Sequence, residues 1–196
     1  PMSARRQRQM CIRDRGSAAI IRQALTEAGE YQQRRRLRGA DQAPIDLGQE
    51  ALVAVLSGER PAIVYAHRAD DIHTALRIGR EFSLDLVIAG AAEGWLVADA
   101  IAAADVPVII GPVMSRSWRA GEQRNSNFAN AAILADAGVK VAFMSGYEGY
   151  VPKVRVVLWE AAIAAANGLG PEATLQALTL DAVSYTHLRA HETTDN

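Results

Sequence analysis

Cysteine is nearly absent from this 196-residue sequence, and the one cysteine, Cys11, lies close to the N-terminus. Residues 16–182 contain none, so this segment holds no disulfide, no thiolate nucleophile and no cysteine-based metal site. No apolar run approaches the roughly 20 residues that a membrane-spanning helix needs. No glycine-rich nucleotide-binding fingerprint follows any of the expected strands. These absences argue against a disulfide-stabilised domain, a membrane partner and a nucleotide-binding fold.

The two ends of the chain are related to each other at the level of DNA. Residues 10–14 can be encoded by ATG TGT ATA AGA GAC, whose reverse complement encodes Val-Ser-Tyr-Thr-His, the sequence of residues 183–187. Both ends also resemble translated adapters of transposase-based sequencing libraries. A natural basic tail and a natural histidine-bearing tail would not account for this complementarity. We therefore predict that residues 1–15 and 183–196 are adapter artefacts.

Residues 16–182 are then expected to be a fragment of a longer gene product whose natural N-terminus is missing. Targeting signals cannot be judged in that case, and a cytoplasmic location is the default. Six of the 21 basic and three of the 22 acidic residues lie in the tails, so the segment keeps 15 basic and 19 acidic residues. Its net charge of −4 gives no indication of a nucleic-acid partner.

Short β-rich runs alternate with helical stripes along the segment, which predicts an α/β fold with a parallel sheet. Helices are also expected before the first strand, from residue 16 to about 29 and over 46–56. Strands are expected near 62–66, 85–90, 106–110 and 139–144, adjacent in sequence order. Helices are expected over 70–82, 95–104, 130–137, 154–169 and 171–178.

Ligands of parallel α/β folds bind beyond the carboxyl ends of the strands, so candidate residues are sought there. His67 follows the first strand and could ligate a metal or transfer a proton, or it could be a hydrogen-bonded histidine at a strand–loop junction. Glu93 follows the second strand and could be a general acid or base, or it could cap the helix that starts there. The remaining pocket candidates follow the third and fourth strands: Met114, Arg116 and Tyr147.

Five motifs, in order, resemble the second half of an amidohydrolase, and the similarity is strongest to the imidazolonepropionase-like branch. The resemblance implies the last four βα units of a (β/α)8 TIM barrel. It also implies a divalent metal, normally zinc, that activates water to hydrolyse C–N bonds of small cyclic amides. The motifs are A-H-R-A-D-D-I-x-x-A-L-R-I, L-V-I-x-G-A-A-E-G-W-x-V-A-D, V-P-V-I-I-G-P, A-x-L-A-D-A-G-V-K-V-A-F and G-L-x-P-E-A-x-L-Q-A-L-T-L-D-A.

The segment departs from that family at the positions where the resemblance implies metal ligands. Tyr65 and Gly90 stand where relatives present histidines, and Gly146 stands where they present an aspartate. His67 is the one candidate metal ligand that remains, and a divalent site needs three or more ligands. We therefore expect no bound metal and no hydrolysis by this fragment alone.

Three hypotheses remain open. The first is a truncated amidohydrolase, a hydrolase by family that is inactive as this fragment. The second is a metal-free binding or regulatory subunit, a homo-oligomer or a partner of an active paralogue. The third is a doubly wound binder of nucleotides or sugar phosphates. An open half barrel would also leave apolar side chains such as Ile63, Val87 and Val108 partly exposed.

Overall fold

The structure, a computed structural model, describes residues 4–37, 42–114, 123–145, 147–148, 151–152 and 154–186. Side chains are described for residues 16–37, 42–114, 123–145 and 155–184. The chain divides into two compact units, which are treated separately below. The described residues up to Ala62, together with Thr74–Leu86, form the first unit. Ile63–His73 and the described residues from Val87 onward form the second.

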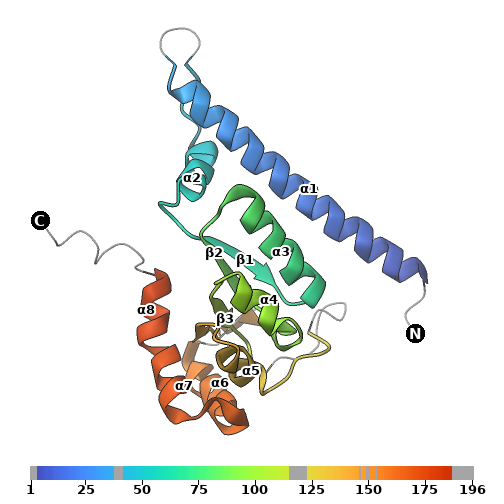
Figure 1. Ribbon diagram of the computed structural model, residues 1–196, viewed down its shortest axis with the longest axis vertical. Coiled ribbons are helices and arrows are strands. Elements are labelled where there is room, and N and C mark those ends of the chain that lie inside the picture. The colour runs from blue at the N-terminus through green and yellow to red at the C-terminus, as the bar shows by residue number, and fades with distance from the viewer. Residues whose placement is uncertain are drawn as a thin grey trace, which may run out of the picture. The chain divides into compact units, whose positions relative to one another are not determined.

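Two helices, α1 (Ala4–Arg35) and α2 (Leu47–Leu56), make up most of the first unit (Figure 1). Helix α1 runs without interruption across the boundary expected for the N-terminal adapter. Asp46 caps α2, because its carboxylate accepts the backbone N–H groups of Gly48 at 2.9 Å and Gln49 at 3.1 Å. The apolar core of this unit consists of Ala18, Leu25 and Ile78, with Leu52, Leu56, Phe82 and Leu84 packed against them.

A four-stranded parallel sheet with the strand order β1-β2-β3-β4 lies at the centre of the second unit (Figure 1). Ile88 of β2 pairs with Val108 of β3, and Val108 pairs with Val141 of β4, so these three residues form one row across the sheet. This confirms the predicted α/β class and strand order, while closure into a barrel stays a prediction. The strands are β1 (Ala62–Ala66), β2 (Leu86–Gly90), β3 (Val108–Ile110) and β4 (Val141–Phe143).

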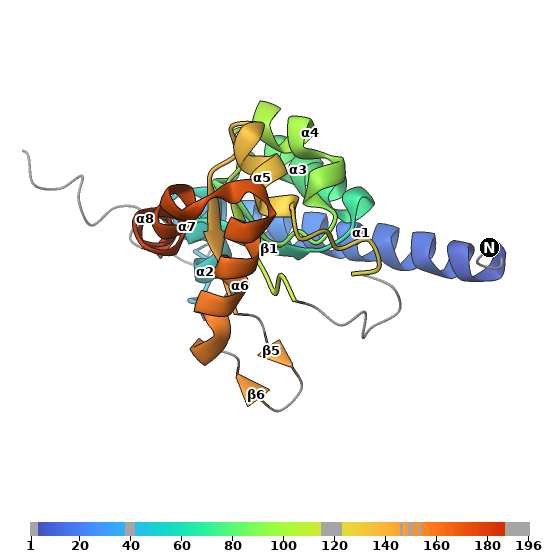
Figure 2. The same ribbon diagram turned by 90° about the horizontal axis from the view of Figure 1, so that it is seen from below.

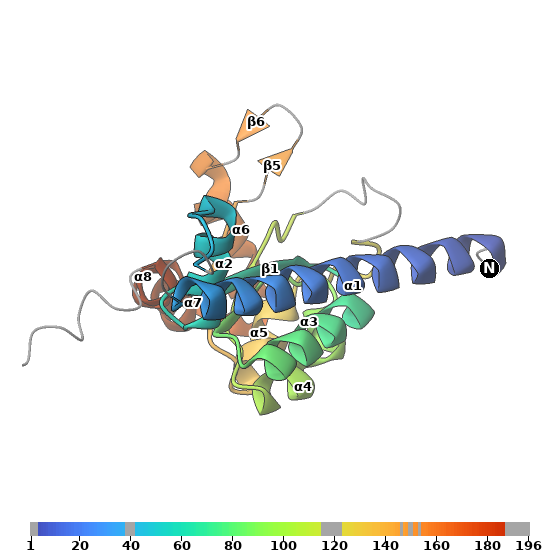
Figure 3. The same cartoon turned by 90° about the horizontal axis from the view of Figure 1, so that it is seen from above.

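Helices connect these strands and follow the last one. Helices α4 and α5 contact each other and lie on the same side of the sheet (Figures 2 and 3). None of the helices among the described residues combines the length and the apolar character needed to cross a membrane. Their bounds are α3 (Ala69–Phe82), η2 (Gly94–Leu96), α4 (Ala98–Ala103), α5 (Asn130–Asp136), α6 (Val157–Ala164), α7 (Pro171–Leu178) and α8 (Leu180–Thr186).

Segment 154–169 is helical, as predicted, but it is not one regular α-helix. The segment consists of a 3₁₀ turn η3 (Val154–Val156), helix α6 and a π-helical turn η4 (Ala165–Leu169). Gly168, with φ of +114°, leaves the helical conformation and produces the kink. The sequence also did not indicate the antiparallel pair β5 (Tyr147–Glu148) and β6 (Val151–Pro152), visible in Figure 2.

Burial differs between the edge strand and the inner strands of the sheet. Ile63 is 57% exposed and Tyr65 is 64% exposed, so one face of β1 is open to solvent, as expected for Ile63. Val87 and Val108 are only 1% and 0% exposed, so the expectation that they would be wet is wrong. Strands β2 and β3 have a neighbour at each edge and both faces covered, whereas β1 is an edge strand.

Candidate functional site

His67 lies directly after β1, at the carboxyl end of the sheet, as the sequence predicts. Its ring contacts the Tyr65 ring edge to face, with the centroids 5.9 Å apart, and its Nε2 lies 3.3 Å from Nε2 of Gln123. The Tyr65 hydroxyl donates to Sδ of Met144 at 3.1 Å. Partial burial raises the pKa of the Tyr65 phenol above 10.0, so this group stays protonated at neutral pH. His73, farther along on α3, is exposed.

The ring of His67 occupies the space that a side chain at position 90 would fill. Gly90 has φ of +93°, and a Cβ built on it would lie 2.7 Å from Cε1 and 2.9 Å from Nδ1 of His67. The absence of a side chain at Gly90 is therefore what allows the imidazole to rest against the end of β2.

The structure makes Glu93 a bridge between distant segments. The residue is 7% exposed. Its Oε2 accepts the N–H of Ala69, the first residue of α3, at 2.9 Å, and its Oε1 accepts Nδ2 of Asn125 at 2.8 Å. Its own N–H donates to the carbonyl of His67 at 2.8 Å. The interpretation of Glu93 as the cap of the helix that follows it is wrong, because its carboxylate caps α3 and makes no bond to η2.

Two further polar side chains, both missed in the sequence, hold the loop before α5. Trp95 donates its Nε1–H to the carbonyl of Asn125 at 2.9 Å. Asn130, which is 4% exposed, donates Nδ2–H to the carbonyl of Ala91 at 2.9 Å. The only sequence signal for this network is the concentration of asparagines just before α5.

Met114 is held in place by a hydrogen bond of its backbone. Its N–H donates to Oε2 of Glu160 at 2.7 Å, and Glu160 is 0% exposed. The other oxygen, Oε1 of Glu160, is buried and has no hydrogen-bond partner among the described residues. Sequence reasoning did not select Glu160, although it is the one charged residue in the otherwise apolar stretch of α6.

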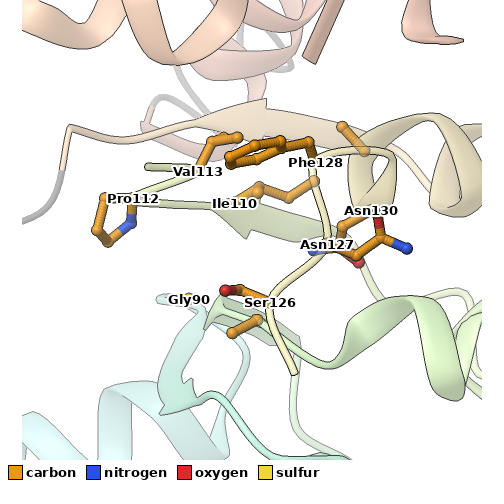
Figure 4. Close-up of a pocket in the computed structure, with 10 residues that line it drawn as sticks. Gly90, Ile110, Pro112, Val113, Ser126, Asn127, Phe128 and Asn130 are labelled. Carbon is orange, nitrogen blue, oxygen red and sulfur yellow. The ribbon is translucent and has the colours of Figure 1, made fainter. Parts of the chain in front are cut away.

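A small hollow of about 10 Å³, about the space that one water molecule needs, lies partly open to solvent at the carboxyl ends of β2 and β3 (Figure 4). Its residues carry no formal charge, so it favours a neutral ligand over an ionic one. Gly90 touches both this hollow and His67, while Glu93 and Met114 do not line it. The apolar part consists of Ile110, Pro112, Val113 and Phe128, and the polar part of Ser126, Asn127 and Asn130.

The other two predicted pocket residues cannot be placed in this arrangement. Arg116 lies outside the described residues, and of Tyr147 the backbone is described, as part of β5, but the side chain is not. The structure therefore brings His67 and Glu93 together through the backbone bond, and it ties Met114 to α6.

An ion pair follows His67 directly in the sequence. Arg68 donates Nε–H to Oδ1 of Asp70 at 2.9 Å and an Nη2 hydrogen to Oδ2 at 2.8 Å, a bidentate arrangement. The hydrogen bond from Arg68 lowers the pKa of Asp70 below 3.8 and in return raises the pKa of the guanidinium. Glu93 adds a smaller attraction that raises the pKa of Arg68 further.

The described side chains do not fit a divalent metal. Among them, no three histidine, cysteine, aspartate or glutamate groups lie close enough to share one ion. The carboxylate of Glu93 is already an acceptor for two donors, and the His67 ring lies against Gly90 and Gln123. One imidazole with amide neighbours falls short of the three or four ligands that a zinc site uses.

Among solved structures, the chain is similar to the crystal structure of an amidohydrolase from Thermotoga maritima MSB8. The two share 31% identity, with a TM-score of 0.80. The similarity covers 88% of this chain and 45% of that protein, so this chain spans less than half of its length. Protein-family models and curated proteins yielded no match. The chain is thus similar in sequence and fold to part of an amidohydrolase.

Proposed function

We propose that the chain is the second half of an amidohydrolase-type (β/α)8 barrel, related to the imidazolonepropionase-like branch. The observation that supports this most is the 31% identity with an amidohydrolase at a TM-score of 0.80. The order of the five sequence motifs and the sequential parallel strands agree with it. The complete protein would be a hydrolase of C–N bonds in small cyclic amides, by family resemblance.

On its own, this chain is proposed to bind a small molecule without hydrolysing it. The uncharged hollow next to Gly90 has room for about one water-sized neutral group of a ligand, with an apolar side against Ile110 and Val113 and a polar side against Ser126. Hydrolysis by the family depends on a metal that polarises the substrate and activates water. Since the described side chains do not fit a metal, no catalytic step is assigned to them.

One observation favours a second candidate, a metal-free binding or regulatory subunit. The His67 ring occupies the space beside Gly90, at the position where the sequence motif of relatives carries a histidine. With glycine at position 90, the His67 ring fills this space, and the side chain that the resemblance implies as a metal ligand there is absent. Under this alternative, the chain would act beside an active paralogue or as a homo-oligomer.

Calorimetric titration of the full chain with Zn²⁺ at neutral pH tests the absence of a metal site. We expect no submicromolar binding, either in the parent chain or in a His67→Ala variant. Submicromolar binding in the parent that disappears in His67→Ala would contradict the proposal. Hydrolysis of a panel of five- and six-membered cyclic amides by the chain alone would contradict it as well.

The gene itself separates the two candidates. The family resemblance implies a His-x-His pair in the first strand of the barrel, upstream of residue 16. Recovery of the upstream DNA with this pair would favour the hydrolase, and upstream DNA without it would favour the metal-free subunit.

A further inference from the structure

The carboxylate of Glu93 connects the two segments that carry His67 and Gln123. One oxygen binds Ala69, two residues after His67, and the other binds Asn125, two residues after Gln123. The backbone N–H of Glu93 also binds the carbonyl of His67 at 2.8 Å. The two partners of the carboxylate are 24 and 32 residues away in the sequence, so no local structure holds them together.

We propose that Glu93 is a positioning residue, which fixes the imidazole of His67 against the amide of Gln123 by clamping the segments on both sides. The functional meaning of this clamp rests on the proposed function, in which His67 belongs to the ligand site. The clamp itself can be tested without any ligand or activity. This role differs from acid–base chemistry, because both carboxylate oxygens are engaged in structural hydrogen bonds.

The carboxylate of Glu93 satisfies both donors at once, with one oxygen for each. Ala69 offers a backbone N–H and Asn125 offers an amide N–H, so both groups that face Glu93 are donors. Glutamine has one acceptor oxygen and one donor nitrogen, and its NH₂ would face one of these donors. Glu93 is 7% exposed and Asn125 is exposed, so the bond to Ala69 is the one that water replaces least readily.

The pairing of His67 with Gln123 gives the clamp a spectroscopic signature. The Gln123 amide nitrogen, 3.3 Å from Nε2 of His67, can act only as a donor. In this orientation of the Gln123 amide, Nε2 of the neutral imidazole is the acceptor and the ring proton is on Nδ1. Loosening of either segment would remove this preference and let the two tautomers of His67 exchange.

Long-range ¹H–¹⁵N correlation spectra of the full chain at high pH, with neutral imidazoles, provide the test. The chain has four histidines, and the His67 signals are assigned by their loss in His67→Gln. We expect a predominant Nδ1–H pattern for His67 in the parent and loss of that pattern in Glu93→Gln. His73, which is exposed on α3, serves as an internal reference that should not change.

The decisive variant combines Glu93→Gln with Asn125→Asp. This exchange places an acceptor at position 125 opposite the amide nitrogen at 93, keeps the total charge and leaves an oxygen for Ala69. We expect the double variant to recover the Nδ1–H pattern of His67 that Glu93→Gln loses. Recovery would show that the His67 pattern depends on the hydrogen bond between positions 93 and 125 and not on either residue alone.

Thr174→Val is the matched control for loss of stability. Thr174 is 7% exposed and donates its hydroxyl to the carbonyl of Gly170 at 2.6 Å, on α7. This variant should lower the melting temperature without altering the Nδ1–H pattern of His67.

The proposal is overturned if Glu93→Gln keeps the parent pattern, if Thr174→Val changes it equally, or if the double variant fails to recover it. If Glu93→Gln does not fold, the single variant Asn125→Asp takes its place. It puts two carboxylates opposite each other at positions 93 and 125, which should break the hydrogen bond between them. An unchanged Nδ1–H pattern of His67 in this variant would overturn the proposal.

Discussion

Replacement of Gly90 by alanine tests how the His67 ring is held at the end of β2. The Cβ of the alanine would lie 2.7 Å from Cε1 of His67, whereas ordinary van der Waals contacts of a Cβ are 3.4–4 Å long. The ring must therefore move away from β2. It would then lose its contact with Nε2 of Gln123 and its edge-to-face contact with Tyr65.

Gly138 offers a control in the same protein. Its φ of +87° is close to the +93° of Gly90, and no atom lies within 4 Å of its hypothetical Cβ. Gly138→Ala should therefore cost only the backbone strain of an L-residue in this region, about 1–2 kcal/mol. Gly90→Ala adds the lost hydrogen bond and the lost ring contact, together about 1–3 kcal/mol. We expect a total loss of about 2–5 kcal/mol for Gly90→Ala.

Urea unfolding followed by circular dichroism measures both variants, in the parent chain and in a His67→Ala background. Removal of the ring should erase the excess, so that Gly90→Ala costs no more than Gly138→Ala in that background. A Gly90→Ala variant that is no less stable than Gly138→Ala in the parent chain would refute this account of the packing. So would an excess that persists after His67 is removed.

Two further predictions concern the stability of the second unit. Leu134→Ala should lower the free energy of unfolding by about 2–5 kcal/mol, because this side chain is 0% exposed, while Leu158→Ala, at 66% exposure, should change it by less than about 0.5 kcal/mol. Equal losses in thermal melts of the two would count against the assigned core. The lowered pKa of Asp70 predicts a stabilising contribution that is fully present above pH 3.8 and is lost as the pH falls through the lower folded value. Asp70→Asn should therefore be less stable than the parent at pH 6, and the difference should shrink in acid unfolding curves below pH 3.8; a constant difference would contradict the ion pair with Arg68.

The elements of this protein follow from local patterns in its sequence. The apolar runs 62–66 and 85–90 and the helical stripe between them determine β1, α3 and β2, because hydrophobic periodicity and turn residues act over a few positions. The same local logic places His67 after the first strand and brings the strand ends to one edge of a parallel sheet. The position of the candidate site was therefore predictable.

The roles of the side chains at that edge were decided by tertiary contacts. Glu93 binds residues 24 and 32 positions away, and Glu160 binds Met114 across 46 positions. The sequence around a glutamate at a helix start is the same whether its carboxylate caps that helix or a different one. Which donors reach it depends on how strands and loops distant in sequence pack together. The burial of Val87 and Val108 likewise depends on neighbours that no local periodicity specifies. Local chemistry thus determined where polar groups gather, and only the packed structure determined what each of them binds.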